Sequence, residues 1–123
     1  MRSYTKLRAK LNREVAAARQ AYLAEFPVCV VCWQGLSGGV HEICRGTANR
    51  VLSISEPATW LAVCTQCNCH ALTDYSQWPI ERQLAVKLCH DPERFNLETI
   101  CRIRVRAISS ITLKDVVQYL EVI

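Results

Sequence analysis

Two Cys-x-x-Cys pairs constrain this chain more than any other feature of its sequence. Cys29 and Cys32 form the first pair, Cys64 and Cys67 form the second, and 31 residues separate Cys32 from Cys64. A spacing of two residues lets a tight turn aim both sulfurs at one tetrahedral ion, and two such turns complete a site of four thiolates. Because a closed site of this kind leaves no coordination position open for chemistry, the pattern predicts a structural zinc ion.

The sequence leaves the identity of the fourth ligand open, because two further candidates closely follow the second pair. Cys69 and His70 lie within reach of the same ion, and either residue could replace Cys67. The remaining cysteines have no partner at ligand spacing, and we interpret them as buried or idle thiols. They are Cys44, Cys89 and Cys101.

Length and composition limit the classes of protein to which the chain can belong. With 123 residues it has room for one small domain, and 50% apolar against 21% charged residues is too hydrophobic for a disordered tail. The longest uncharged run, residues 57–73, contains Thr, Gln, Asn and His, so we expect no membrane span. No secretory signal is visible at the start, which predicts a reducing cytoplasm, where cysteines serve as metal ligands more often than as disulfides.

Hydrophobic periodicity predicts helices on both sides of the cysteine pairs. Residues 4–25 form one amphipathic pattern, which Pro27 cannot continue. Residues 79–89 form a second helical pattern that begins at a proline, a favourable residue for a first turn. Residues 101–106 alternate as in a strand, whereas the apolar residues around them fit a helix, so their structure is left open.

Two shorter segments complete the expected elements. Residues 40–43 have the β-branched character of a strand and follow a glycine-containing turn, so we predict the second strand of a hairpin, with His41 and Glu42 on opposite faces. Thr112 and Asp115 have the spacing of a capping box, which predicts a last helix through Leu120. The apolar face of that helix could pack inward or pair with another subunit, so the oligomeric state is open.

Positive charge is concentrated at the N-terminus. The formal net charge of the chain is +4, yet residues 1–20 alone carry six basic side chains against the single acid Glu14. Such an arm suits a polyanion, and nucleic acid is the commonest polyanion in a cell. A solvated helix face is the simpler alternative.

Three segments together resemble the HNH endonuclease family, in particular its small phage and prophage members. They are residues 26–32 (FPVCVVC), residues 40–46 (VHEICRG) and residues 60–68 (WLAVCTQCN). Their order, a cysteine knuckle, a strand with a His-containing pair and a second knuckle leading into a helix, is similar to that of a treble clef. The resemblance covers residues 5 to 90.

The resemblance implies a set of functional residues. His41 takes the place of the family's cation ligand, and Glu42 takes the place of its general base, which is a histidine in the family. Asn68 matches a third functional residue, with His70 as its rival if the register differs by two. The family's middle asparagine would fall near Thr59, where this chain has none. A catalytic Mg²⁺ or Mn²⁺ is implied, and the reverse assignment, His41 as base and Glu42 as ligand, is equally open.

Basic residues near these segments are the candidates for DNA contact. Arg45 and Arg50 follow the predicted strand, and Lys6, Lys10 and Arg13 lie on the N-terminal helix. Lys and Arg side chains at these positions would neutralise backbone phosphates.

The sequence therefore predicts an α+β protein, a small zinc-stabilised treble clef of ββα-metal type with flanking helices. We expect one domain over residues 1–123, made of a basic helix (4–25), an HNH-like core (27–78) and a helical C-terminal part (79–123). The expected function is a metal-dependent DNA endonuclease or nicking enzyme in the cytoplasm, that of the host if the protein is phage encoded. The alternative is a non-catalytic zinc-stabilised module that binds nucleic acid or a protein partner.

Overall fold

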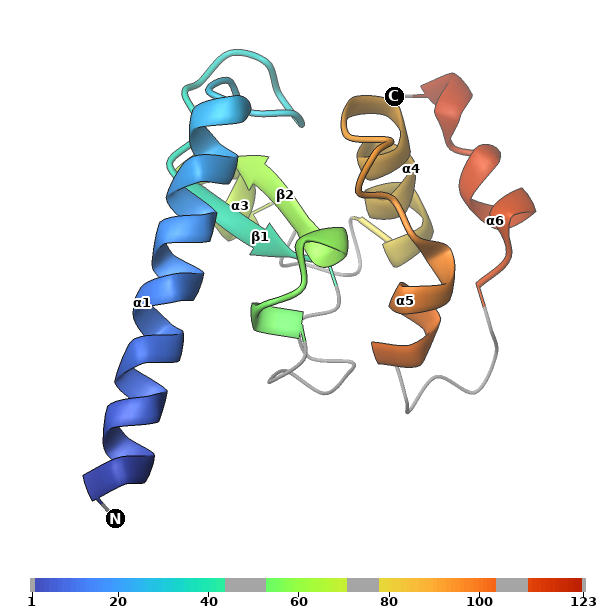
Figure 1. Ribbon diagram of the computed structural model, residues 1–123. Helices are drawn as coiled ribbons and strands as arrows, with labels where there is room; N and C mark the ends of the chain where they lie inside the picture. The colour runs from blue at the N-terminus through green and yellow to red at the C-terminus, as the bar shows by residue number, and fades with distance from the viewer. Residues whose placement is uncertain (1, 44–52, 71–77, 104–110, 123) are drawn as a thin grey trace.

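The computed structural model describes residues 2–43, 53–70, 78–103 and 111–122, and these combine helices with a two-stranded sheet (Figure 1). The elements follow in this order: α1 (Arg2–Glu25), β1 (Gly39–Glu42), the 3₁₀ turn η1 (Pro57–Thr59), β2 (Trp60–Val63), α3 (Thr65–His70), α4 (Ile80–His90), α5 (Leu97–Ile103), α6 (Leu113–Val117) and the 3₁₀ turn η2 (Leu120–Val122). The expected mixture of helix and strand is confirmed, and the division of the chain into one domain stays a prediction. Within the described ranges, no helix is long and apolar enough to cross a bilayer.

Helix α1 confirms the predicted N-terminal helix and extends it by two residues. Its C-terminal part packs on the body of the protein, where Tyr22 is buried. Its N-terminal part projects beyond the sheet (Figure 1), and Leu7 and Leu11 are 68% and 51% exposed there. The amphipathic pattern therefore predicted the helix correctly, although its first half buries no apolar face within the part of the chain that the structure describes.

The two strands pair with each other in antiparallel register. Gly39 lies opposite Val63, and Glu42 lies opposite Trp60. The prediction that residues 40–43 form the second strand of a hairpin with the segment before them is wrong, because β1 is the first strand and pairs with β2. The preceding segment closes a separate loop through an isolated bridge between Val28 and Leu36, so it is not available to pair with β1.

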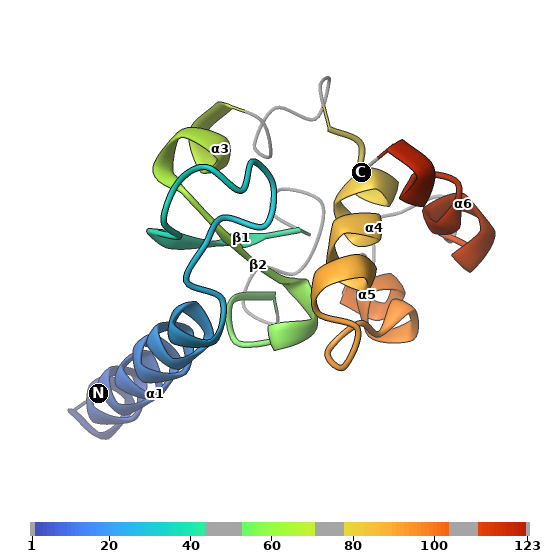
Figure 2. The ribbon, with the colours of Figure 1, turned by 90° about the horizontal axis from the view of Figure 1, so that it is seen from above.

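The two faces of the sheet pack against different helices (Figures 1 and 2). Leu61 and Val63 belong to the larger core cluster, together with residues of α4 such as Leu84. Trp60 and Ala62 form a smaller cluster with Tyr22 of α1. Alternate residues of β2 therefore point to opposite sides, as the period-two geometry of a strand requires.

The C-terminal helices decide the structure left open around residue 101, and the last helix is shorter than predicted. α4 confirms the helix predicted over 79–89. α5 shows that the ambiguous segment is helical as far as Ile103, and residues 104–106 lie outside the described ranges. The predicted capping box is present, because Thr112 accepts from the Asp115 N–H and the Asp115 carboxylate accepts from the Thr112 N–H. The α-helix ends at Val117 rather than Leu120, and η2 follows it.

A buried charge network joins α1, β2 and α4. The Lys87 ammonium is fully buried and lies 2.6 Å from Asp91 Oδ2, 2.9 Å from the Tyr22 hydroxyl and 2.7 Å from the Trp60 carbonyl oxygen. It also donates to the carbonyl oxygen of Pro57. Since a buried ammonium is tolerated only when its donors are satisfied and its charge is balanced, this network fixes how the helices sit on the sheet.

Candidate metal centre

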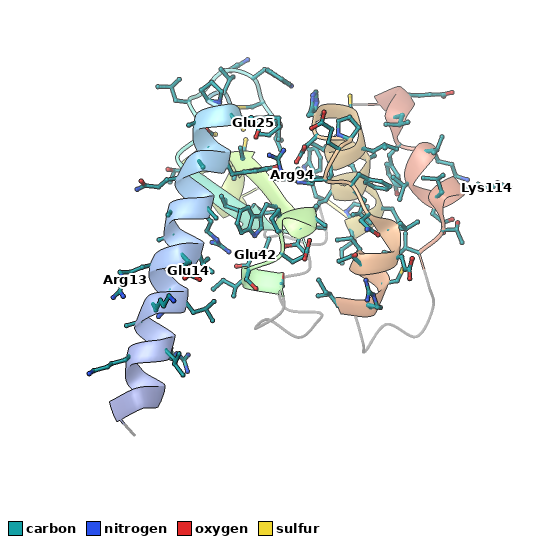
Figure 3. The ribbon with its side chains drawn as sticks, viewed as in Figure 1. Arg13, Glu14, Glu25, Glu42, Arg94 and Lys114 are labelled. Carbon is teal, nitrogen blue, oxygen red and sulfur yellow. The ribbon has the colours of Figure 1, made fainter. Side chains whose placement is uncertain are left out.

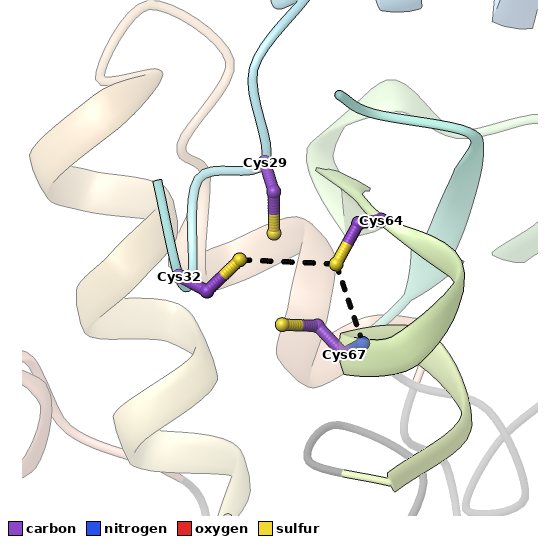
Figure 4. Close-up of side chains that lie close together, drawn as sticks. All are labelled: Cys29, Cys32, Cys64 and Cys67. Carbon is purple, nitrogen blue, oxygen red and sulfur yellow. Dashed lines mark hydrogen bonds between the residues drawn. The ribbon is translucent and has the colours of Figure 1, made fainter. Parts of the chain in front are cut away.

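The four cysteines of the two Cys-x-x-Cys pairs converge on one point (Figure 4). All four sulfur atoms lie within 4.8 Å of one another, and Cys32 Sγ lies 3.8 Å from Cys64 Sγ. A tetrahedral zinc ion with Zn–S distances of about 2.3 Å requires sulfurs about 3.8 Å apart. The four side chains therefore fit a metal ion such as zinc.

The first pair is presented by a tight loop between Val28 and Leu36. The Cys29 N–H donates to the Gly35 carbonyl oxygen at 2.9 Å, and the Trp33 N–H donates to the Cys29 carbonyl oxygen at 3.0 Å. Trp33 adopts a left-handed backbone with a φ of 59°, which is uncommon for a bulky residue. These contacts reverse the chain directly after Cys32 and turn both thiols inward.

The second pair lies where the sheet passes into α3. Cys64 directly follows β2, and Cys67 lies in the first turn of α3, where its N–H donates to Cys64 Sγ at 3.5 Å. The two loops approach closely at Gly35, because a Cβ atom at this position would lie 3.2 Å from Cys64 Cβ. A side chain at this position would crowd Cys64, so glycine favours the close approach of the two loops.

The thiols of the cluster differ in pKa because their surroundings differ. The backbone N–H groups of Gln34 and Gly35 donate to the Cys32 sulfur and lower the pKa of this thiol to about 6. Burial raises the pKa of the Cys67 thiol well above its usual range, and hydrogen bonds to the neighbouring thiols add to the effect. Four thiolates gathered at one point require a cation to balance their charge. A structural metal ion would supply it.

The predicted ligand set is thus brought together. Among the described residues, these four cysteines are the only group of three or more His, Cys, Asp or Glu side chains arranged to hold a metal. The rival ligands Cys69 and His70 lie in α3, and their side chains fall outside the described part of the chain. Of the unpaired cysteines, Cys89 is exposed and Cys101 is half-buried, and Cys44 lies outside the described residues.

His41 and Glu42 lie on opposite faces of β1, as predicted. His41 is 2% exposed, and its Nε2 lies 2.7 Å from the side-chain oxygen of Gln83 in α4. Glu42 is 6% exposed, and its Oε2 lies 3.2 Å from an Arg19 guanidinium nitrogen of α1. The two neighbouring residues are therefore held by different helices.

Arg19 makes two further contacts that hold α1 against the sheet. Its guanidinium also donates to the carbonyl oxygen of Ile54 and lies 5.3 Å from the centre of the Trp60 ring. Neither Arg19 nor Gln83 was singled out by sequence reasoning, because no motif spacing connects them to residues of β1.

Several predicted functional residues have surroundings that the structure describes only in part. Asn68 and His70 lie in α3 next to the cysteine cluster, but the structure does not describe their side chains. Arg45 and Arg50 lie wholly outside the described residues. Thr59 is buried, and its hydroxyl lies within hydrogen-bonding distance of the carbonyl oxygens of Ser53 and Glu56. The Thr59 side chain thus stabilises the turn that precedes β2.

The basic residues of α1 are accessible. Lys6, Lys10 and Arg13 are exposed on the projecting part of the helix, where Figure 3 labels Arg13 beside Glu14. Lys10 lies 4.0 Å from Glu14, an exposed pair of small energetic value. Their role in DNA contact stays a prediction.

Comparisons with family models, with curated proteins and with solved structures find no match to this chain.

Proposed function

We propose that the protein is a metal-dependent DNA endonuclease or nicking enzyme of the HNH type, built on a treble clef whose four cysteines hold a structural zinc ion. The observation that carries this proposal is the placement of His41 on the face of the β1–β2 sheet that packs against the cysteine cluster. His41 pairs with Leu61, and Leu61 shares a core cluster with Cys29 and Cys67.

The order of elements supports the same proposal. A cysteine loop, two antiparallel strands and a short helix follow one another, and α3 contacts β1. Asn68 and His70 belong to α3, whose backbone lies near β1, and this supports their inclusion in the proposed site. Asn68 and His70 are our candidates for holding a Mg²⁺ or Mn²⁺ ion beside His41, and such an ion would polarise a phosphate and stabilise the leaving oxygen.

The contacts of β1 favour His41 over Glu42 as the residue that activates water. The Glu42 carboxylate faces α1 and is paired with Arg19, on the opposite side of the sheet from the cysteines. Imidazole is also the stronger base at neutral pH. We therefore assign the proton transfer to His41 and interpret Glu42 as the residue that anchors α1.

The projecting half of α1 supplies a surface for the substrate. Lys6, Lys10 and Arg13 are exposed on this half of α1, which projects beyond the sheet (Figure 1). Electrostatic contacts of this kind supply affinity for the phosphate backbone and weaken as salt is raised.

A plasmid assay tests the proposal. Zinc-loaded protein is incubated with supercoiled plasmid and with a branched duplex in Mg²⁺, Mn²⁺ or EDTA, alongside His41→Ala and the control His90→Ala. His90 ends α4 and packs against the exposed Trp33, so its loss leaves β1 intact. We expect nicking that depends on the added cation, survives in His90→Ala and disappears in His41→Ala. Absence of cleavage with either cation would contradict the proposal.

A second candidate function is a non-catalytic module that binds nucleic acid or a protein partner on the same zinc scaffold. The burial of His41 and Glu42 favours it, because both side chains are bonded to residues of the protein itself. DNA binding that is intact and sensitive to salt, without cleavage in any metal, would support a nucleic-acid-binding module. Loss of both binding and cleavage would favour a protein partner.

A further inference from the structure

The projecting half of α1 carries an exposed apolar stripe. Leu7 and Leu11 are four residues apart, so their side chains lie on one face of the helix, and both are exposed. The half-buried Val15 continues the stripe by one turn. Tyr22, two turns further on, ends it in contact with the Trp60 ring. The stripe is therefore the outward continuation of the face with which α1 packs on the protein (Figure 1).

The basic side chains of this half lie on a different face. Lys6, Lys10 and Arg13 follow one another at spacings of four and three residues, which places them on a common face. With about 100° per residue, the centre of this face lies about 130° around the helix from the centre of the apolar stripe. Figure 3 shows Arg13 and Glu14 on different sides of α1, and Glu14 is three residues from Leu11, at the edge of the stripe. α1 therefore presents a cationic surface and an apolar surface side by side.

The width and the charge of the apolar stripe select its occupant. One leucine or valine per turn gives the narrow seam of a helix pair, rather than the broad apolar face of a helix that lies in a membrane surface. A second copy of the chain is disfavoured, because residues 1–20 carry six basic side chains and one acid, and two such helices would repel each other. Phosphate backbones are contacted by charged and polar groups rather than by leucine. These properties fit a helix that has an apolar seam and acidic flanks.

We propose that the N-terminal half of α1 is a docking surface for an acidic amphipathic helix of a partner protein, which covers Leu7 and Leu11 and places carboxylates beside Lys10. The excess of positive charge in this half supports an acidic partner, and the continuity of the stripe with the packed face of α1 supports a helix that lies along it. The proposal does not depend on the nuclease proposal, because it concerns leucines that the DNA contacts do not use.

Two synthetic peptides test the docking surface on the full-length, zinc-loaded protein. One is an acidic helix with leucine at the a and d positions of about three heptads and glutamate on its flanks, and the other has glutamine in place of every leucine. Fluorescence anisotropy gives their affinities for the wild type, Leu7→Gln/Leu11→Gln and the control Ala9→Gln, which changes an exposed residue on the opposite face of α1. The wild type and the control should bind the leucine peptide about 100-fold more tightly than the glutamine peptide, or about tenfold for each leucine covered. The double variant should bind both peptides alike.

Three further measurements on the same proteins separate docking from folding and from DNA contact. Circular dichroism should show equal helix content in all three proteins. Amide hydrogen exchange in residues 2–14 of the wild type should slow when the leucine peptide is added, because a helix half without packed neighbours opens readily. The DNA affinity of the double variant should equal that of the wild type, since Lys6, Lys10 and Arg13 are retained.

Equal affinity of the wild type for the two peptides would overturn the inference, as would an unchanged affinity of the double variant for the leucine peptide. Three other results would overturn it by assigning the stripe to a different occupant. Self-association of the wild type that is lost in the double variant would indicate a second copy, leucine-dependent binding to phosphatidylglycerol vesicles would indicate a lipid surface, and weaker DNA binding by the double variant would indicate nucleic acid. Because none of these measurements uses cleavage, a protein that cuts no DNA would refute the nuclease proposal and leave this test unaffected.

Discussion

Removal of the Asp91 carboxylate should destabilise the protein strongly, because it leaves a buried ammonium without its counter-ion. Asp91 is the counter-ion of Lys87, whose ammonium is fully buried and otherwise contacts only neutral groups. In Asp91→Ala the ammonium would remain in the core without a balancing charge. Loss of one partner from a buried ion pair costs about 3–5 kcal/mol.

This cost corresponds to a large shift in melting temperature. Unfolding entropy is about 2.1 cal/mol/K for each residue, or about 0.26 kcal/mol/K for a chain of this length, so Tm should fall by about 12–19 °C. Glu25→Ala is a matched control, because Arg94 contacts both Asp91 and the half-exposed Glu25. An exposed pair contributes about 0–1 kcal/mol, so Glu25→Ala should have little effect.

Urea unfolding of the zinc-loaded wild type, Asp91→Ala and Glu25→Ala gives the two free-energy differences directly. A loss in Asp91→Ala of less than about 1 kcal/mol, or one equal to that of Glu25→Ala, would refute the reasoning that Lys87 depends on its buried counter-ion.

Two further predictions concern Lys87 and the cysteine loops. Burial lowers the pKa of Lys87 from 10.5 to about 8, so between these values the unfolded chain binds more protons and the free energy of unfolding should rise with pH, by up to about 1.4 kcal/mol per pH unit. Urea titrations should show this contribution as a difference between the wild type and Lys87→Met, and equal pH dependence in the two proteins would contradict it. In Gly35→Ala the added methyl group would crowd Cys64, so zinc affinity measured by chelator competition should fall by about 1–3 kcal/mol, whereas Gly39→Ala, with open space at its Cβ position, should bind zinc as the wild type does. Equal affinity of the two glycine variants would show that the close approach does not matter.

The features that could be predicted from the sequence depend on residues close together in the chain. Spacing within each Cys-x-x-Cys pair predicted a shared site because a tight turn places both sulfurs on one side. The period of apolar residues predicted α1 and α4, and the Thr112–Asp115 capping box was read from a three-residue spacing. Local geometry decides each of these features.

The features that could not be predicted depend on contacts between distant segments. The strand partner of β1 lies beyond a long connection, and the composition of residues 39–42 carries no information about it. The contacts of Gln83 with His41 and of Arg19 with Glu42 likewise join separate helices to the sheet. Their partners are determined by how the helices pack, which no local spacing encodes.

Zinc stoichiometry is the most direct test of the metal centre on which both candidate functions depend. Native mass spectrometry of the purified chain should show one zinc ion per folded protein, released on acid unfolding. Cys32→Ser/Cys64→Ser should lose the ion, and Cys89→Ser, which changes an exposed thiol outside the cluster, should retain it. A chain that folds without any metal, or a double variant that keeps its zinc, would contradict a four-cysteine zinc centre.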